Sequence, residues 1–202
     1  MILLGLLLLA AAIALTAYNI WDGKRAKDAS DTIAAELDDR MPEPTRAPEF
    51  EPNPTEMPTE EIDGYLYIGE LDIPSRDLHL PVMADWDYER LRISPCRYSG
   101  SYYTDDLVIC AHNYARHFSP IRWVEPGEEV YFTNVEGKVY RYEVTNRETV
   151  QPTSISQMIE NQNNSLIGGN GNAGDWDLTL FTCNTGGQTR CAVRCARVAD
   201  EN

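Results

Sequence analysis

The run ILLGLLLLAAAIALTAYNI, residues 2–20, constrains the fold of this chain more than any other segment. It is nearly free of polar side chains, and as a helix it is roughly long enough to cross the hydrocarbon core of a bilayer. An uncleaved membrane anchor at residues 1–21 is the favoured interpretation, because the run is long for a signal peptide. The alternative is a secretory signal peptide cleaved near Ala17. Lys24, Arg25 and Lys27 follow the run, and by the positive-inside rule they argue against an extracellular domain after it.

Residues 22–63 predict an acidic, proline-rich spacer. Residues 28–63 hold 12 Asp or Glu and 2 Arg, and residues 41–58 hold six of the twelve prolines. Ser30-Asp31-Thr32 indicates the start of a short helix that Pro42 ends. We therefore expect a semi-rigid linker that holds a following domain away from the bilayer. The formal net charge of −15 also argues against sequence-independent binding to nucleic acid, which needs a basic face.

Residues 64–202 predict one mostly β domain with short helices, enough chain for an independent core. A turn at Glu136-Gly137 predicts a hairpin, residues 154–160 predict a short helix, and residues 161–174 predict a loop rich in Asn and Gly. This pattern is typical of a small β-barrel or sandwich. Short strands are expected at residues 65–73, which Pro74 closes, and at residues 78–82, 107–112, 130–133, 139–144, 149–150, 178–183 and 190–195.

Three chemically useful side chains stand at predicted strand ends. Cys183 ends one strand, Arg190 begins the next after a short turn, and His112 ends the most apolar strand in the chain. A cysteine nucleophile needs a proton carrier and a group that stabilises an oxyanion, and these residues could supply both. The alternative is a buried, inert cysteine beside an arginine that forms only a surface salt bridge. His79 is expected to be structural, because it lies between Leu78 and Leu80, and His117 could be a surface residue.

The cysteines leave two interpretations open. In an extracytoplasmic domain Cys96, Cys110, Cys191 and Cys195 could form disulfides. Of their three possible pairings, the one that joins Cys191 to Cys195 is disfavoured, because these residues lie too far apart on one strand. The alternative, which we favour, is that all five are reduced. The Cys and His spacings do not resemble a metal site, so none is expected.

Three separated motifs resemble those of the sortases, the cysteine transpeptidases of Gram-positive cell surfaces. Residues 179–183, TLFTC, resemble the family's TLxTC signature, residues 190–194, RCAVR, resemble the strand with the essential arginine, and residues 111–113, AHN, resemble the histidine motif. Ala111 stands where the family usually has glycine. The similarity covers roughly residues 64–198, with IGELDIP at residues 68–74 resembling the opening strand.

The resemblance implies a closed eight-stranded sortase-type β-barrel and a covalent mechanism. Cys183 would attack a carbonyl in an LPxTG-like sorting signal and form a thioester, His112 would protonate the leaving amine, and Arg190 would stabilise the oxyanion. An amine from a peptidoglycan precursor or a pilin lysine would then resolve the thioester. Substrate contact is expected from three further residues: Leu180, Thr182 and Asn113.

The resemblance also implies partners and a location. Neither a cofactor nor calcium is expected, and the partners would be surface proteins or pilins with a C-terminal sorting signal. The enzyme would be a single-pass membrane protein with an extracellular catalytic domain. The extended segment between Thr149 and Leu178 favours class B, and Asp85-Trp86-Asp87 is interpreted as a loop rather than as the aromatic lid of pilin-polymerising sortases.

Two rival interpretations remain at the level of sequence. One is another cysteine enzyme of the L,D-transpeptidase type, although Phe181-Thr182 does not match the segment that usually precedes its cysteine. The other is a membrane-anchored β domain without catalytic activity, which binds a surface partner.

Overall fold

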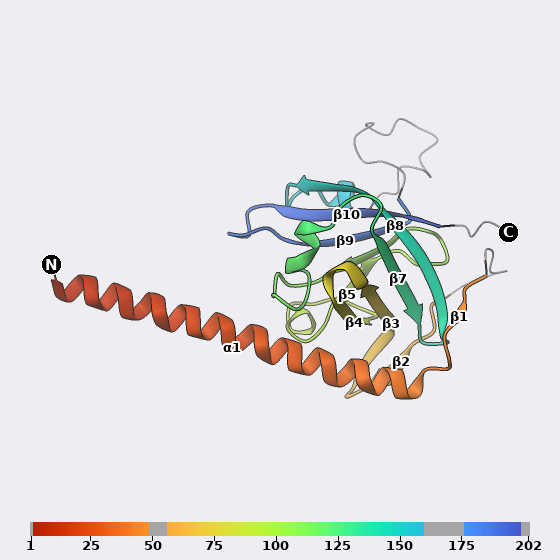
Figure 1. Cartoon of the computed structure of the whole chain (residues 1–202), viewed down its shortest axis with the longest axis horizontal. Helices are drawn as coiled ribbons and strands as arrows, with labels where there is room; N and C mark the ends of the chain where they lie inside the picture. Colours follow the sequence, from red (N-terminus) through yellow and green to blue (C-terminus); the bar gives the residue numbers. More distant parts are fainter. Residues whose placement is uncertain (1, 49–55, 160–175, 199–202) are drawn as a thin grey trace.

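A computed structural model of the chain describes residues 2–48, 56–159 and 176–198 (Figure 1). It has one long helix, α1 (Ile2–Arg40), one short helix, α2 (Ile155–Ile159), and ten strands. The strands are β1 (Thr45–Arg46), β2 (Glu60–Ile62), β3 (Tyr65–Ile73), β4 (Leu78–Met83), β5 (Cys96–Ser99), β6 (Leu107–Cys110), β7 (Glu129–Asn134), β8 (Lys138–Val150), β9 (Leu178–Cys183) and β10 (Arg190–Arg197). Short 3₁₀ turns, η1 (Pro74–Arg76), η2 (Arg90–Arg92) and η3 (Ser119–Trp123), lie between strands.

Eight of these strands close into a barrel. The hydrogen-bonded order runs β3–β7–β8–β10–β9–β6–β5–β4 and returns to β3, while β1 and β2 add to the edges at β8 and β3. Most neighbours are antiparallel, but β4 runs parallel to β5 and β6 runs parallel to β9. The prediction of a mostly β fold with a closed eight-stranded barrel is confirmed.

The sheet buries apolar side chains on both of its faces. Alternate residues of β10 show this, because Cys191 and Val193 belong to the core inside the barrel, whereas Ala192 belongs to a second core outside it. Phe181 of β9 lies in the outer core, together with Ile33 and Leu37 of α1. The outer core is therefore where helices and loops cover the barrel.

β3 is one strand from Tyr65 to Ile73, as the sequence predicts, and it bends within its length. Its pairing with β4 shifts register between Tyr67 and Gly69, and Gly69 has φ of 146°. A Cβ at Gly69 would lie 2.0 Å from the carbonyl oxygen of Thr133 on β7. Only glycine allows this close approach of β3 and β7, so the bend at Gly69 lets the strand follow the barrel wall.

The sequence predicts a membrane helix, a break and then a second, short helix, whereas the structure has the single helix α1. The chain remains helical from Ile2 to Arg40, so no new helix begins at Ser30. The first half projects away from the barrel, and the second half lies along it (Figure 1). The buried positions recur every three or four residues, which is the period of one helix face: Asp22, Ala26, Ser30, Ile33, Ala34 and Leu37.

The segment after α1 also contacts the barrel instead of acting as a free spacer. The Thr45 amide donates to Gly137 O at 2.7 Å, the Ala47 amide donates to Val139 O at 3.0 Å, and β1 pairs with β8. Described parts of residues 22–63 are therefore packed on the barrel. Spacer positions 49–55 lie outside the described residues.

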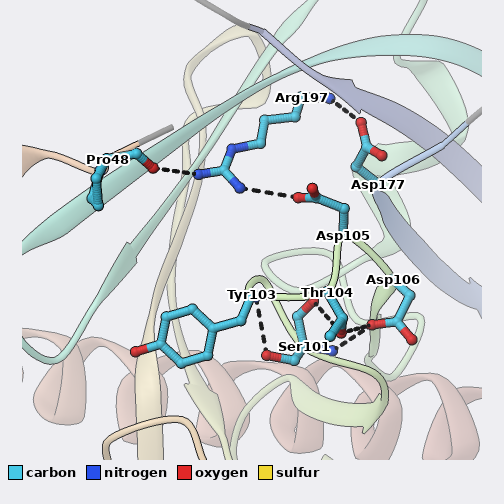
Figure 2. A network of polar contacts seen from close by, with 8 residues as sticks. All are labelled: Pro48, Ser101, Tyr103, Thr104, Asp105, Asp106, Asp177 and Arg197. Atoms are coloured by element: carbon cyan, nitrogen blue, oxygen red, sulfur yellow. Dashed lines mark hydrogen bonds and ion pairs between the residues drawn. The ribbon is translucent and has the colours of Figure 1, made fainter. Parts of the chain in front are cut away.

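Arg197, at the end of β10, joins this N-terminal segment to the barrel (Figure 2). Its guanidinium donates to Pro48 O at 3.1 Å and to Asp105 Oδ1 at 3.0 Å, and its backbone amide donates to Asp177 Oδ2 at 2.6 Å. Through its side chain and its backbone amide, Arg197 thus connects the segment after α1, the β5–β6 loop and the residue before β9.

The remaining predictions agree closely with the structure. The hairpin joins β7 and β8 at Glu136-Gly137, where the Gly137 amide donates to Asn134 O at 2.8 Å. The short helix appears as α2, and β8 runs on to Val150, which merges two predicted strands into one. The predicted Asn- and Gly-rich loop, residues 161–174, lies outside the described residues.

Candidate active site

Cys183 is the first partly exposed residue of an otherwise buried strand. Residues 178–182 of β9 are all buried, and Cys183 follows them at the barrel rim. The turn that begins at Asn184 is closed by two hydrogen bonds, from the Asn184 amide to Thr189 O at 2.9 Å and from the Gly187 amide to Asn184 O at 2.8 Å. The thiol is therefore carried on a rigid strand and still reaches solvent.

Arg190 lies directly opposite Cys183 across the β9–β10 pair. Residues opposite each other in an antiparallel pair project from the same face of the sheet, so both side chains belong to one surface. Arg190 Nη1 donates to Gly187 O at 2.8 Å and to Thr189 O at 3.2 Å. These two carbonyls hold the guanidinium at the turn beside Cys183.

The parallel pairing of β6 with β9 carries His112 to the same rim. Cys110 is opposite Phe181, and the contact continues past the end of β6. The Ala111 amide donates to Phe181 O at 3.3 Å, and Thr182 Oγ1 donates to Ala111 O at 2.8 Å. His112 is the next residue after Ala111, as Cys183 is the next after Thr182, so the two follow the paired segments at the same end of the barrel. The structure thus brings all three predicted catalytic residues to one rim.

His112 is half-buried, and its surroundings tune its charge. Burial lowers the pKa of His112, the guanidinium of Arg92 lowers it further, and the carboxylate of Asp22 opposes both. The imidazole is therefore held toward its neutral form, in which it can accept a proton from a thiol.

Helix α1 covers the loop that follows His112. The sequence did not predict this contact. Tyr114, whose ring centroid is 5.1 Å from that of His112, donates its hydroxyl to Asp22 Oδ2 of α1 at 2.6 Å. Asp22 also receives Arg25 at 3.1 Å and lies 3.6 Å from Arg92. The hydrogen bond from Tyr114 is the main reason that the pKa of Asp22 is lowered. The helical period of buried positions from Asp22 to Leu37 is the sequence signal that could have revealed this contact.

The sequence suggested that His117 could be a surface residue, but the structure shows that it is not. It is fully buried, and burial lowers its pKa to about 4, so the ring is neutral. Its ring centroid lies 5.4 Å from that of Tyr114. It belongs to the packed loop after His112 and not to the rim.

The three residues expected to contact substrate are placed differently from one another. Leu180 is fully buried inside the barrel, and Thr182 is 1% exposed with its hydroxyl bonded to Ala111 O. Neither side chain reaches the surface. In the structure both residues pack within the barrel wall and help to shape β9, and neither is exposed for the substrate contact that the sequence suggested. Asn113 is partly exposed and lines a hollow of about 640 Å³ between the histidine loop and α1.

Arg194, the second arginine of β10, is buried in a network of contacts within the sheet. It is fully buried and donates to Glu148 Oε1 at 2.8 Å and to Thr179 Oγ1 at 2.7 Å. Its guanidinium lies 5.2 Å from the ring centroid of Trp176. These contacts join Arg194 to β8, to β9 and to the segment before β9. Arg194 is therefore not available at the rim where Arg190 lies.

A comparison with protein families places residues 71–198, more than half of the chain, in the family described as Sortase domain. The chain belongs to the sortase family. Sortases are cysteine transpeptidases, so the predicted enzyme class is confirmed. Among curated protein sequences, none matches this sortase.

Solved structures share the fold of this sortase. Sortase C1 from Streptococcus agalactiae is 21% identical, with a TM-score of 0.55, over 70% of this chain and 72% of that one. A Sortase D5 transpeptidase from Clostridium perfringens is 16% identical, with a TM-score of 0.54, over 66% and 79%. Sortase C1 from Streptococcus suis is 24% identical, with a TM-score of 0.51, over 67% and 74%. These structures are sortases C and D, whereas the sequence favoured class B, and at such identities the likeness shows the fold without assigning a subclass.

The five cysteines of this sortase are free thiols in the structure. Cys96 and Cys110 are directly opposite each other on β5 and β6, both buried, and burial is the main reason that the pKa of each is raised. The four buried cysteines therefore behave as small apolar side chains, and Cys183 is the partly exposed one.

Proposed function

We propose that this sortase cleaves an LPxTG-like sorting signal through a thioester on Cys183 and transfers the product to an amine. The observation that supports the proposal is strand register: Arg190 is paired with Cys183 across β9 and β10, and the parallel β6–β9 pair ends two residues before His112 and Cys183. The Cys183 thiol loses its proton to His112 and attacks the scissile carbonyl carbon. Arg190 donates to the oxyanion that forms, because a guanidinium keeps its charge and its donors throughout.

The second half of the reaction uses the same groups. The tetrahedral intermediate collapses, the carbon–nitrogen bond breaks, and His112 returns its proton to the leaving amine. The acyl group remains on Cys183 until a peptidoglycan precursor or a pilin lysine supplies the second amine. The second amine loses its proton to His112 as the thioester bond breaks. No cofactor takes part in this scheme.

We also propose that the apolar half of α1 anchors the enzyme with its barrel outside the cell. Within the described residues, α1 is long and apolar enough to cross a membrane, with a mean hydropathy of 2.1 over its most apolar window. The basic residues after this run argue against the topology by sequence alone. In the structure Arg25 pairs with Asp22 and Lys27 pairs with Asp31, so two of the three positive charges are offset locally.

An aromatic row beside Cys183 is the surface that we propose for the sorting signal. Phe181 lies on the same face of β9 as Cys183, two residues before it. The Tyr98 ring lies 5.1 Å from Phe181, and the Trp86 ring lies 5.2 Å from Tyr98. Trp86 is in the loop after β4, as expected, and is 38% exposed at the end of the row. An extended peptide with an apolar residue fits such a surface.

Trp86→Ala is expected to raise KM for the sorting peptide about three- to tenfold with little change in kcat, because an aromatic contact contributes about 0.5–1.5 kcal/mol to binding. Steady-state kinetics with a fluorescent peptide would measure this effect. Tyr131→Ala is the matched control, since β7 does not adjoin β9. An unchanged KM for Trp86→Ala would exclude the aromatic row from substrate binding.

Arg92→Gln is expected to move the limb of the pH–rate profile that reports His112 to higher pH. The Arg92 cation lowers the pKa of His112, so its removal raises that pKa and keeps the protonated acid to higher pH. The profile of kcat/KM against pH measures the shift. Arg90→Gln, on the same η2 turn, is the control. A shift to lower pH, or none, would contradict the assignment of the limb to His112.

Intact mass spectrometry tests the proposed chemistry directly. The full chain in detergent micelles is mixed with a pool of LPxTG-like and NPxTN-like peptides. A mass gain equal to the N-terminal peptide fragment, absent in Cys183→Ala, supports the thioester and identifies the preferred signal. No adduct together with a Cys183 thiol inert to a small reagent favours the remaining alternative, a sortase-fold domain that binds a partner without catalysis.

A further inference from the structure

A second cluster of polar side chains lies where α1 meets the barrel. Asp38 comes from α1, Glu70 from β3 and His79 from β4. Each residue offers one atom that can bind a metal ion, a ring nitrogen of His79 or a carboxylate oxygen of Asp38 and Glu70. These three atoms lie within 4.8 Å of one another. His79 Nε2 is 3.5 Å from Glu70 Oε2 and 3.6 Å from Asp38 Oδ2. These strands do not adjoin β9, so the cluster is separate from the rim with Cys183.

The two distances from His79 in this cluster fit an ion pair, and they fit equally well two ligands of one metal ion. A nitrogen–oxygen separation of 3.5–3.6 Å is too long for a good hydrogen bond. Two ligand atoms each about 2.1 Å from a tetrahedral ion are about 3.4 Å apart. The separation of His79 Nε2 from each carboxylate oxygen is therefore that of two ligands of one ion, and the two carboxylates, which share a hydrogen bond in the absence of an ion, are close enough to bind it together.

Glu70 supplies an independent sign of a missing partner. Its side chain is 2% exposed, and its Oε1 atom has no hydrogen-bond partner among the described residues. A buried carboxylate is costly unless it is paired, hydrogen-bonded or bound to a metal. Its other oxygen, Oε2, lies 3.5 Å from His79 Nε2, so the carboxylate reaches the cluster with one oxygen while the other oxygen lacks a hydrogen bond.

Asp72 orients the histidine for this role. The Nδ1 atom of His79 is 2.7 Å from Asp72 Oδ1, a good hydrogen bond. When Nδ1 carries that proton, the lone pair of Nε2 points to Glu70 and Asp38. A carboxylate that fixes a histidine in this way is the usual support of a metal-binding imidazole.

We propose that Asp38, Glu70 and His79 bind a divalent ion of the zinc class and so clamp α1 onto the barrel. One imidazole and two carboxylates suit zinc better than calcium or magnesium, which prefer oxygen ligands alone. Asp38 is exposed, and the cluster borders a hollow of about 580 Å³ that gives an ion access from solvent. This proposal replaces the expectations that His79 is only structural and that no metal binds, and it does not depend on the proposed reaction.

The competing explanation is that His79 is simply an imidazolium among carboxylates. Its contact with Asp72 is the main cause that raises the pKa of His79, to about 9, so without an ion the ring is protonated and offsets part of the negative charge. In that case the cluster needs no ion. Zinc binding distinguishes the two explanations.

The experiment is a calorimetric titration of ZnCl₂ into the full chain in detergent micelles after treatment with EDTA. The Cys183→Ala background removes the partly exposed thiol as a competing ligand. We expect one equivalent of zinc, a higher melting temperature with zinc, and no comparable effect of calcium. Glu70→Gln and His79→Gln should weaken binding at least 100-fold, and Asp72→Asn about 10- to 100-fold.

Two further variants keep the test decisive if a buried substitution fails to fold. Asp38→Asn changes a mostly exposed helix residue and should weaken zinc binding without unfolding the chain. Asp77→Asn, an exposed carboxylate on the same hollow, is the matched control and should bind zinc normally. Absence of saturable binding, or equal binding by Asp38→Asn and the parent, would overturn the proposal. The same titration with cobalt in place of zinc gives an absorption spectrum that reports the ligands. Thiolate charge-transfer bands in that spectrum would also overturn the proposal, because they would show that cysteines bind the ion.

Discussion

Cys183→Ala should abolish the covalent peptide adduct and lower transpeptidation at least about 10⁴-fold, because no other group can form the thioester. The melting temperature should change by no more than about 2 °C, since Cys183 is partly exposed at a strand end and such substitutions alter stability by about 0.5 kcal/mol or less. Peptide mass spectrometry and a thermal melt of the same samples measure the two effects together.

Two companion variants separate catalysis from structure. His112→Ala should also remove nearly all activity at an almost unchanged melting temperature, because its half-buried ring lies at the rim. Cys191→Ala removes a thiol inside the barrel and should keep the adduct, with a modest loss of stability from the small cavity. A Cys183→Ala protein that melts far below the parent would mean that Cys183 is structural, and that the loss of activity reports unfolding.

The barrel was predictable because its strands carry local signals. Residues 178–183 and 190–195 are apolar segments separated by a turn, and they became β9 and β10 with nearly the predicted bounds. Alternation and turn residues depend only on neighbours in the sequence, so a single chain reveals them. The closure of the strands into a barrel came from the resemblance to sortases and not from the pattern alone.

The role of α1 was missed because it depends on tertiary contacts. Ser30 looked like a helix start, since serine caps helices well, but in the structure it is buried within a continuous helix. Packing of Ile33 and Leu37 in the outer core stabilises the helix through that position. The acidic residues likewise suggested a solvated spacer, and only the folded chain shows that Asp22 and Asp38 face groups of the barrel.

The sequence predicts the residues of the candidate site, but it does not predict what surrounds them. Motif spacing predicts His112, Cys183 and Arg190 as the catalytic residues. In the structure Cys183 ends β9, Arg190 begins β10, and His112 lies two residues after the end of β6. The same motif suggested Leu180 and Thr182 as substrate contacts. Sequence cannot tell the inner from the outer face of β9, and the structure puts Leu180 inside the barrel.

The two arginines of β10 should respond oppositely to substitution, although they are four residues apart on one face of the strand. Arg190→Lys should lose most activity, because lysine cannot reproduce the guanidinium fork, while the melting temperature stays nearly unchanged. Arg194→Ala should lower stability by about 3 kcal/mol, roughly 6–12 °C, since it leaves Glu148 and Thr179 without their buried partner.

The contrast between these variants tests the assignment of Arg190 without relying on either alone. Below its lowered melting temperature, Arg194→Ala should still form the peptide adduct, because its contacts lie within the sheet and not at the rim. Thermal melts and adduct formation, measured on both variants at one temperature, give the comparison. If Arg194→Ala melted like the parent but lost the adduct, then Arg194 would be the arginine that acts on substrate, and the buried network would have to open during the reaction.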